Sequence, residues 1–234
     1  MPAPNQYAVE QRAADLTRRH GHLDGLALLR PMIEREFPGR IAVVSSFGAE
    51  SAAILGLIAE IDPATPVLFL DTRKHFAETL AYRDALATRL GLADLRVIGP
   101  DSSALAEQDS DGWLWQRNPD RCCHLRKVLP LRRALRGFDA WITGRKRYQS
   151  SARAQLAPIE VAEGRIRINP IATWTAADVE AAFEAAGLPR HPLVEMGYPS
   201  IGCAPCTRSV VAVDSLRAGR WTGTPKTECG IHRA

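Results

Sequence analysis

The sequence predicts an α/β protein with a mostly parallel sheet. After residue 40, short β-rich runs alternate with amphipathic stretches of helical length, which is the pattern of βαβ units. Hydrophobic residues make up 46% and charged residues 24% of the 234 residues, so the chain can bury an ordinary core. Its apolar runs are far shorter than the ~20 residues of a membrane span. We therefore expect a single domain over residues 1–234 and no membrane segment.

The elements are expected in a definite order. Residues 1–37 should form N-terminal helices, because apolar and charged positions recur at helical spacing on both sides of a break at residues 21–24. The α/β core is expected over residues 38–188. Within it, strands are predicted at 41–45, 67–70, 95–98 and 140–143, and helices at 50–60, 76–90 and 122–135.

A hairpin and a helix close the predicted core. Residues 159–161 and 166–168 should pair, and Thr175 is a candidate N-cap, with Asp178 at N3, for a helix that ends at residue 186. Prolines and glycines become frequent in residues 189–234. We expect irregular structure there, lying over the carboxyl ends of the strands, where open α/β sheets bind ligands.

Two loops after predicted strands could meet a ligand. The first runs from Ser45 through Ser46 to Ser51, and its small residues would let backbone N–H groups approach an anion at a helix start. It matches neither standard nucleotide motif, and an ordinary capped turn is the alternative. In the second loop, Asp71 and Thr72 could reach a sugar or a base edge, or simply cap a helix.

Four of the five cysteines fall into two close pairs, Cys122 with Cys123 and Cys203 with Cys206. Four thiolates in such pairs can surround zinc or an iron–sulfur cluster. Adjacent cysteines fit the usual ligand spacing of structural zinc poorly, whereas neighbouring side chains can diverge to different irons of a cluster. The alternative is one buried thiol beside an inert one.

The fifth cysteine, Cys229, lies in the sequence Glu-Cys-Gly-Ile-His near the end of the chain. We expect it to be exposed and mobile, with His232 or an arginine nearby to favour the thiolate that attacks. A stray cysteine without a role is the alternative.

Basic residues near predicted strand ends and in the closing segment are candidate contacts for an anion. Arginine matches phosphate or sulfate oxygens with two parallel hydrogen bonds, although charge runs are more often solvated. Position favours Lys127, Arg153, Arg217 and Arg220. The net charge of +4 suits a small anionic ligand and falls short of a nucleic-acid footprint.

Taken together, these motifs resemble the assimilatory sulfonucleotide reductases, specifically the iron–sulfur branch that acts on adenylylsulfate (APS). The resemblance covers nearly everything after Arg40. It depends on the two cysteine pairs, the Glu-Cys-Gly-Ile-His stretch, the Ser-Phe-Gly-Ala-Glu turn at residues 46–50, and Thr143-Gly144 followed by Gln149-Ser150.

The resemblance implies an adenine-nucleotide α-hydrolase-like, Rossmann-like sheet with helices on both faces. Residues 189–234 would supply a cluster loop and a mobile catalytic tail. The implied ligands of a [4Fe–4S] cluster are Cys122, Cys123, Cys203 and Cys206. The implied contacts of the phosphosulfate are Ser45, Ser46, Ser51, Lys127, Arg153, Arg217, Arg220 and His232.

The same resemblance implies that Cys229 attacks the sulfur of APS, releasing AMP and leaving an S-sulfocysteine. Thioredoxin or glutaredoxin would then release sulfite, in assimilatory sulfate reduction and cysteine biosynthesis. We expect this reductant to be a separate protein, since no thioredoxin-like domain follows Cys229. One departure is Arg73, which stands where the family usually has glycine after Leu-Asp-Thr and predicts a different path for the loop at Asp71.

Three other functions stay open. The 3′-phosphorylated substrate PAPS could be reduced by the same chemistry, although that branch of the family generally lacks the cluster cysteines. A tRNA-thiolating, ATP-using enzyme would need a Ser-Gly-Gly-type loop, and a cluster-binding redox sensor would leave Cys229 without a task. Residues 1–10 lack the pattern of a secretory signal, so we expect a cytoplasmic protein with reduced thiols. The oligomeric state stays open, a homo-oligomer included.

Overall fold

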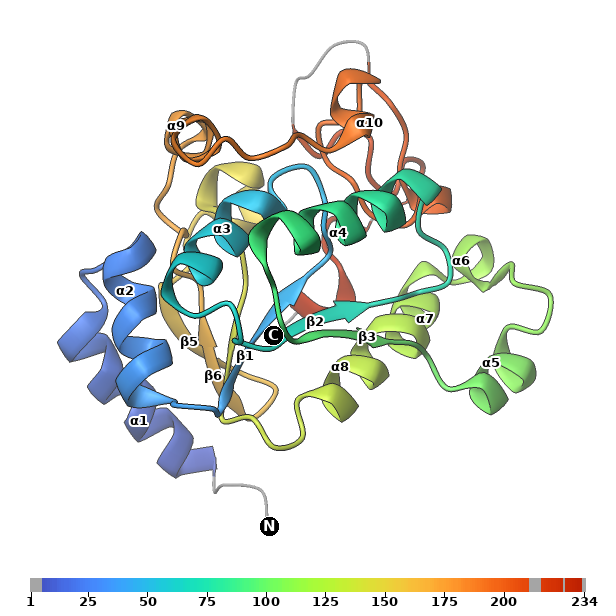
Figure 1. Cartoon of the computed structure of the whole chain (residues 1–234). Coiled ribbons are helices and arrows are strands. Elements are labelled where there is room, and N and C mark those ends of the chain that lie inside the picture. Colours follow the sequence, from blue (N-terminus) through green and yellow to red (C-terminus); the bar gives the residue numbers. More distant parts are fainter. Residues whose placement is uncertain (1–5, 211–215, 225, 233–234) are drawn as a thin grey trace.

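A computed structural model describes residues 6–210, 216–224 and 226–232, and shows one six-stranded sheet in the order β3-β2-β1-β4-β6-β5 (Figure 1). The strands are β1 (Ile41–Ser45), β2 (Val67–Leu70), β3 (Leu95–Ile98), β4 (Ala140–Ile142), β5 (Ile159–Ala162) and β6 (Arg165–Ile168). Every neighbouring pair is parallel except β5 with β6. The predicted mostly parallel sheet is confirmed.

The described helices include every one that the sequence predicts and three short ones that it does not. They are α1 (Gln6–His20), α2 (Gly25–Pro31), α3 (Ser51–Ile61), α4 (Ala77–Leu90), α5 (Ser102–Gln108), α6 (Leu114–Arg117), α7 (Pro119–Cys123), α8 (Leu129–Ala134), α9 (Ala176–Ala185) and α10 (Pro192–Glu195). A π-helical turn, Met32–Glu36, follows α2, and another, His124–Val128, joins α7 to α8. The short helices α5, α6 and α10 were not expected.

Helices cover both faces of the sheet because the strand side chains alternate between two cores. Val43 and Phe69 face the larger core, which α1, α2, α3, α4 and α9 complete. Val44 and Leu68 point the other way, onto Leu131 of α8. Burying each such side chain contributes roughly 1.5–3 kcal/mol, so both layers stabilise the same sheet. Along the β5–β6 edge, α1 lies against both strands.

The hairpin and the last long helix form as the local sequence predicts. Glu163 and Gly164 connect β5 to β6, both at positive φ, as a two-residue type I′ turn requires. The hydroxyl of Thr175 accepts a hydrogen bond from the backbone N–H of Asp178, whose carboxylate bonds back to the Thr175 backbone. This capping box fixes where α9 begins.

The order of the strands opens a crevice between β1 and β4. From β1 the chain runs outward through β2 and β3, and then returns to the other side of β1 to form β4. The loops that follow β1 and β4 therefore diverge at the carboxyl ends of these strands, where open α/β sheets bind ligands. The described part of the closing segment is largely irregular, as expected, with α10 and two short 3₁₀ turns, Ala204–Cys206 and Gly230–His232.

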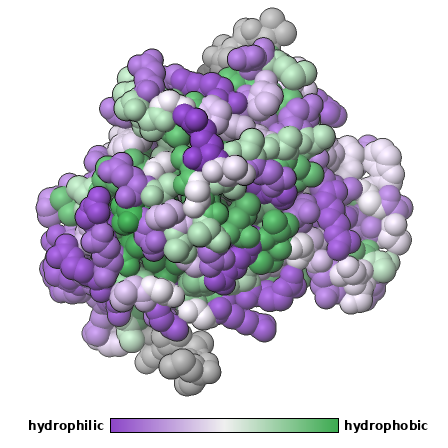
Figure 2. All heavy atoms as spheres, viewed as in Figure 1, coloured by the Kyte–Doolittle hydropathy of each residue, from purple (hydrophilic) through white to green (hydrophobic). Residues whose placement is uncertain are grey.

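The described helices are too short or too polar to span a membrane. On the face shown in Figure 2, hydrophilic side chains dominate the periphery and hydrophobic side chains concentrate across the middle, around α3 and α4.

Candidate active site

A cleft of about 1170 Å³, counted out to its open mouth, lies at the crevice between β1 and β4. Its walls come from the turn after β1, the segment after β4, and the closing segment. All nine residues predicted to contact or transform the substrate line it: Ser45, Ser46, Ser51, Lys127, Arg153, Arg217, Arg220, Cys229 and His232. Val44, Ile54 and Leu70 add an apolar wall. The volume suits a ligand as large as a nucleotide.

The turn after β1 is tight and stabilised by its own serines. The hydroxyl oxygen of Ser45 accepts a hydrogen bond from the Phe47 N–H at 3.2 Å, and that of Ser51 accepts from the Gly48 N–H at 2.9 Å. Phe47 has a φ of 48°, in the left-handed region. These two backbone N–H groups are therefore occupied, contrary to the expectation that such groups would approach an anion. The serine hydroxyl hydrogens stay available as donors.

Six cationic side chains line the cleft, and two of them are anchored in the core. Lys146 is 1% exposed, and its ammonium lies 2.7 Å from the carboxylate of Glu50. Glu50 also accepts hydrogen bonds from Tyr148 and Gln149, both at 2.6 Å. Arg145 is buried and paired with Glu160. Neither Arg145 nor Lys146 is among the predicted substrate contacts.

Arg153 and Arg217 share a carboxylate that the sequence did not single out, that of Glu228. Arg153 Nε and Nη2 donate to the two Glu228 oxygens at 2.6 and 2.9 Å, and Arg217 Nη2 approaches one of them at 3.3 Å. Burial opposes ionisation of Glu228, but the hydrogen bond and charge of Arg153, with the charge of Arg217, hold its pKa below the usual value. Burial lowers the pKa of Arg217 to about 10. Two predicted substrate contacts are thus already ion-paired within the protein.

Cys229 is buried, with 8% of its surface exposed, so the prediction of an exposed thiol is wrong for this conformation. Its neighbours Lys226 and Glu228 are also buried, and each forms an ion pair, which draws the thiol inward. A hydrogen bond from Cys123, together with the charges of Lys127 and Arg220, lowers the pKa of Cys229 despite its burial. The site therefore favours a thiolate at Cys229.

His232 does not supply the positive charge that was expected beside Cys229. Burial and the nearby arginines, Arg145 and Arg153 first among them, lower its pKa well below the usual value, so its imidazole is neutral. Its Nδ1 atom is buried and has no hydrogen-bond partner within the described structure. The neighbouring cations Lys127 and Arg220 take the expected role.

The other four cysteines line a second cavity, of about 370 Å³, beside the cleft. Lys127, Arg220 and Trp221 line both spaces, so the two share a wall. His, Cys, Asp and Glu are the side chains that commonly bind metals. Among the described residues around this cavity, the four cysteines are the only side chains of these types. Such an all-thiol set fits the ligand chemistry of an iron–sulfur cluster or of zinc. Within the described residues, no three such side chains converge closely enough to hold a single metal ion.

The adjacent cysteines both line this cavity but pack against different neighbours. Cys122 packs with Leu105 and Leu125, whereas Cys123 packs with Trp221 and Cys229. They lie at the end of α7, which begins one turn earlier than predicted because Pro119 starts it and the side chain of Asn118 caps it.

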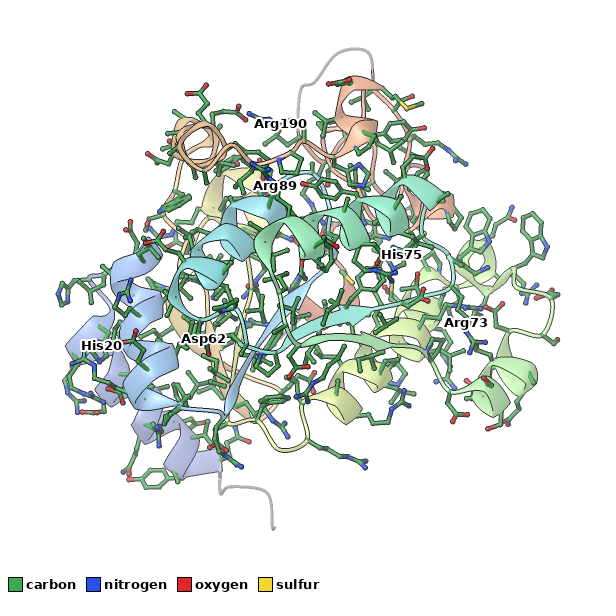
Figure 3. All side chains as sticks on the ribbon, viewed as in Figure 1. His20, Asp62, Arg73, His75, Arg89 and Arg190 are labelled. Atoms are coloured by element: carbon green, nitrogen blue, oxygen red, sulfur yellow. The ribbon has the colours of Figure 1, made fainter. Side chains whose placement is uncertain are left out.

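The loop after β2 lies between the two spaces: Thr72 and Lys74 line the second cavity, whereas His75 lines the cleft. Thr72 Oγ1 lies 3.2 Å from Cys203 Sγ, and the Asp71 carboxylate accepts from the Arg73 N–H at 2.8 Å. Asp71 is not among the described residues that line the cleft, so its expected contact with a sugar or base finds no support. Arg73 has a φ of 58°, and its guanidinium donates to the Ser102 hydroxyl at 3.1 Å, on the side of the molecule that carries α5 (Figure 3). The arginine adopts a conformation that glycine takes without strain.

Comparisons with known proteins identify relatives over most of the chain. A family model described as the phosphoadenosine phosphosulfate reductase domain matches residues 40–209. An adenosine 5′-phosphosulfate reductase from Mesorhizobium japonicum is 51% identical over 96% of this chain and 88% of its own length. A phosphoadenosine 5′-phosphosulfate reductase from Gloeobacter violaceus is 41% identical over 85% of this chain and 84% of its own length.

A solved structure also resembles the fold. The phosphoadenylyl-sulfate reductase from Candida auris, in a phosphate complex, aligns with a TM-score of 0.70 and 30% identity over 86% of this chain and 97% of that one.

Proposed function

Since the chain belongs to the phosphoadenosine phosphosulfate reductase family, we propose that it is the oxidoreductase that reduces adenylylsulfate to sulfite and AMP, with Cys229 as nucleophile. The observation that carries this proposal is the place of Cys229. Its thiol lies at a nucleotide-sized cleft, and two cations, Lys127 and Arg220, favour its ionised form. The name of the relative from Mesorhizobium japonicum supports APS as the substrate.

Substrate binding follows from the chemistry of the cleft walls. The adenosine would lie against the apolar wall of Val44, Ile54 and Leu70. The phosphosulfate would face the serine hydroxyls and the cations, which offset its charge. A sulfonyl sulfur is surrounded by anionic oxygens, so cations must mask these oxygens before a thiolate can approach.

The reaction then proceeds in two steps whose electrons balance. The Cys229 thiolate attacks the sulfonyl sulfur, the bond from sulfur to the bridging oxygen breaks, and its electron pair leaves with AMP. In the second step a thiol of thioredoxin, or of glutaredoxin, attacks the Cys229 sulfur and releases sulfite. The partner's second thiol resolves the mixed disulfide, so its dithiol supplies both electrons.

The proposal includes a [4Fe–4S] cluster held by Cys122, Cys123, Cys203 and Cys206. The all-thiol lining and the different packing neighbours of the adjacent cysteines support it. The bound group would supply structural support and local charge beside the cleft. In that arrangement Lys127 and Arg220 orient the substrate anion from the shared wall. A cytoplasmic location, where thiols stay reduced, belongs to the same proposal.

PAPS is the second candidate substrate, favoured by the name of the relative from Gloeobacter violaceus. Anaerobically purified protein should be incubated with APS or PAPS without reductant, and the peptide that contains Cys229 examined by mass spectrometry. A thioredoxin-releasable sulfonate with APS alone is the expected result. A sulfonate with PAPS would make PAPS a substrate, and none with either would contradict a reductase.

A further inference from the structure

The C-terminal segment, residues 226–232, is attached to the rest of the molecule mainly by side chains. Within the described chain, the backbone hydrogen bonds of these residues, such as the one from the His232 N–H to the Cys229 C=O, join residues close together in the sequence. Side-chain contacts hold the segment in place: Lys226 pairs with Asp120 of α7, Glu228 pairs with Arg153, and Cys229 contacts Cys123. Ion pairs can exchange partners without unfolding the core.

Glu228 differs from the other carboxylates that neutralise cations of the cleft. Glu50 follows β1 and is held by Lys146, Tyr148 and Gln149. Glu160 lies on β5, where it is held by arginines and by an amide. Glu228 instead belongs to the C-terminal segment, which side chains hold in place. It can therefore separate from Arg153 and Arg217 without disrupting a strand.

A bound phosphosulfate would compete with Glu228 for the same guanidinium groups. Arginine pairs with a carboxylate and with a phosphate or sulfate through the same two parallel N–H groups. Arg153 uses both Nε and Nη2 on Glu228, and Arg217 approaches the same carboxylate. Both arginines line the cleft, where the anionic part of the substrate would bind. Two anions at one arginine pair repel each other, so occupancy by one disfavours the other.

We propose, on the basis of the function proposed above, that Glu228 is a positioning residue whose carboxylate the substrate displaces. In the substrate-free protein, Glu228 holds the C-terminal segment in the cleft through Arg153 and Arg217. The incoming phosphosulfate takes over these arginines and releases Glu228. Release frees the adjacent Cys229 to turn from Cys123 toward the sulfur that it attacks. Substrate binding and mobilisation of the nucleophile are thus one coupled exchange.

The test measures the affinity for adenylylsulfate in a Cys229→Ser background, which prevents turnover. Glu228→Gln keeps the size of the side chain and one of its two acceptor oxygens, but removes the competing charge. Coupling of this kind usually changes affinity severalfold, so we expect Glu228→Gln to tighten binding by roughly fivefold or more. The matched control is Asp120→Asn, which removes the other ion pair of the segment and leaves Arg153 paired. It should not tighten binding, and thermal unfolding should show that both variants fold.

Hydrogen–deuterium exchange of residues 226–232 gives a second readout that needs only the Cys229→Ser protein. Adding adenylylsulfate should speed exchange of this segment, whereas slower exchange would overturn the proposal. Unchanged or weaker binding by Glu228→Gln would overturn it as well, because Glu228 would then orient the arginines rather than compete with substrate. If no variant binds adenylylsulfate and the unmodified protein forms no Cys229 sulfonate, the proposed function itself fails. If the variants bind adenylylsulfate but Glu228→Gln binds it no more tightly, only the proposed displacement of Glu228 is overturned, and the proposed function stands.

Discussion

Gly202 and Arg220 approach each other so closely that a Cβ at Gly202 would meet Arg220 Nη2 at 2.2 Å and Cζ at 2.6 Å. Arg220 lines both the cleft and the cysteine cavity. Glycine at position 202, directly before Cys203, therefore lets the guanidinium lie against the backbone. The place of this cation depends on the absence of one methyl group.

Gly202→Ala should displace Arg220 and slow formation of the Cys229 sulfonate. Loss of one preorganised charge-stabilising group typically slows a reaction by 10²–10³-fold, and partial displacement should cost roughly tenfold. Single-turnover mass spectrometry with APS measures the rate. Gly99→Ala is the matched control, since a Cβ at Gly99 meets nothing within 4 Å. Equal rates in the two variants would mean that Arg220 does not assist the chemistry.

Cys229→Ser should abolish the sulfonate adduct and sulfite release while nucleotide binding persists. Serine keeps the size of the side chain, but its hydroxyl stays protonated where Cys229 has a lowered pKa. Visible absorbance of the anaerobic protein is expected to be unchanged, because Cys229 is not one of the four cysteines around the second cavity. Loss of colour in Cys229→Ser would instead place Cys229 among the metal ligands.

His191 should make the fold less stable as the pH falls below neutrality. Burial lowers its pKa from 6.5 to about 4. Its Nδ1 accepts from the Leu193 N–H, so Nε2 carries the proton that faces the Thr79 hydroxyl. Protonation of Nδ1 would break the first bond. The unfolded chain binds this proton at a higher pH than the folded chain does. The contribution of neutral His191 to the free energy of unfolding is therefore lost as the pH drops through 6.5 toward 4.

The expected size of this loss is about 2 kcal/mol between about pH 7 and pH 5. Urea unfolding of the parent and of His191→Asn, whose side-chain oxygen can replace Nδ1 as acceptor, should diverge by that amount. Parallel pH dependences would show that His191 does not titrate in this way.

Replacing Arg73 tests the strain in the loop after β2. Arg73→Gly and Arg73→Ala both lose the hydrogen bond to Ser102. The difference between their free energies of unfolding therefore measures the cost of the left-handed backbone conformation at a φ of 58°. That conformation costs a non-glycine residue about 1 kcal/mol. The glycine variant should be more stable than the alanine variant by that amount in chemical denaturation. The opposite order would place the strain elsewhere.

Local sequence determines most of the framework. β1 and β2 are short apolar runs between turn residues, and the Thr175 cap gives the start of α9, so periodicity and capping suffice to predict them. The place of Arg153 at the cleft was also predictable, because it follows β4 and loops at the carboxyl ends of neighbouring parallel strands meet.

Contacts between distant residues were not predictable. Arg153 pairs with Glu228, 75 positions further along the chain, and no local pattern encodes that choice. The burial of Cys229 follows from the same pair and from Lys226 with Asp120. α5 and α6 were missed because helices of 7 and 4 residues carry too few turns to show a period. The neutral state of His232 depends on arginines brought together only by folding.

The pairing of β1 with β4 affects the order in which the protein folds. Ile41 pairs with Ala140, and the residues between them must fold into two other strands and several helices before or while this pairing forms. Closing so long a loop is entropically slow compared with forming the adjacent β1–β2 pair. The crevice that holds the site is therefore expected to be among the last features to form during folding. Substitutions that weaken the β1–β4 pairing should leave molecules with much native secondary structure and no capacity to bind nucleotide.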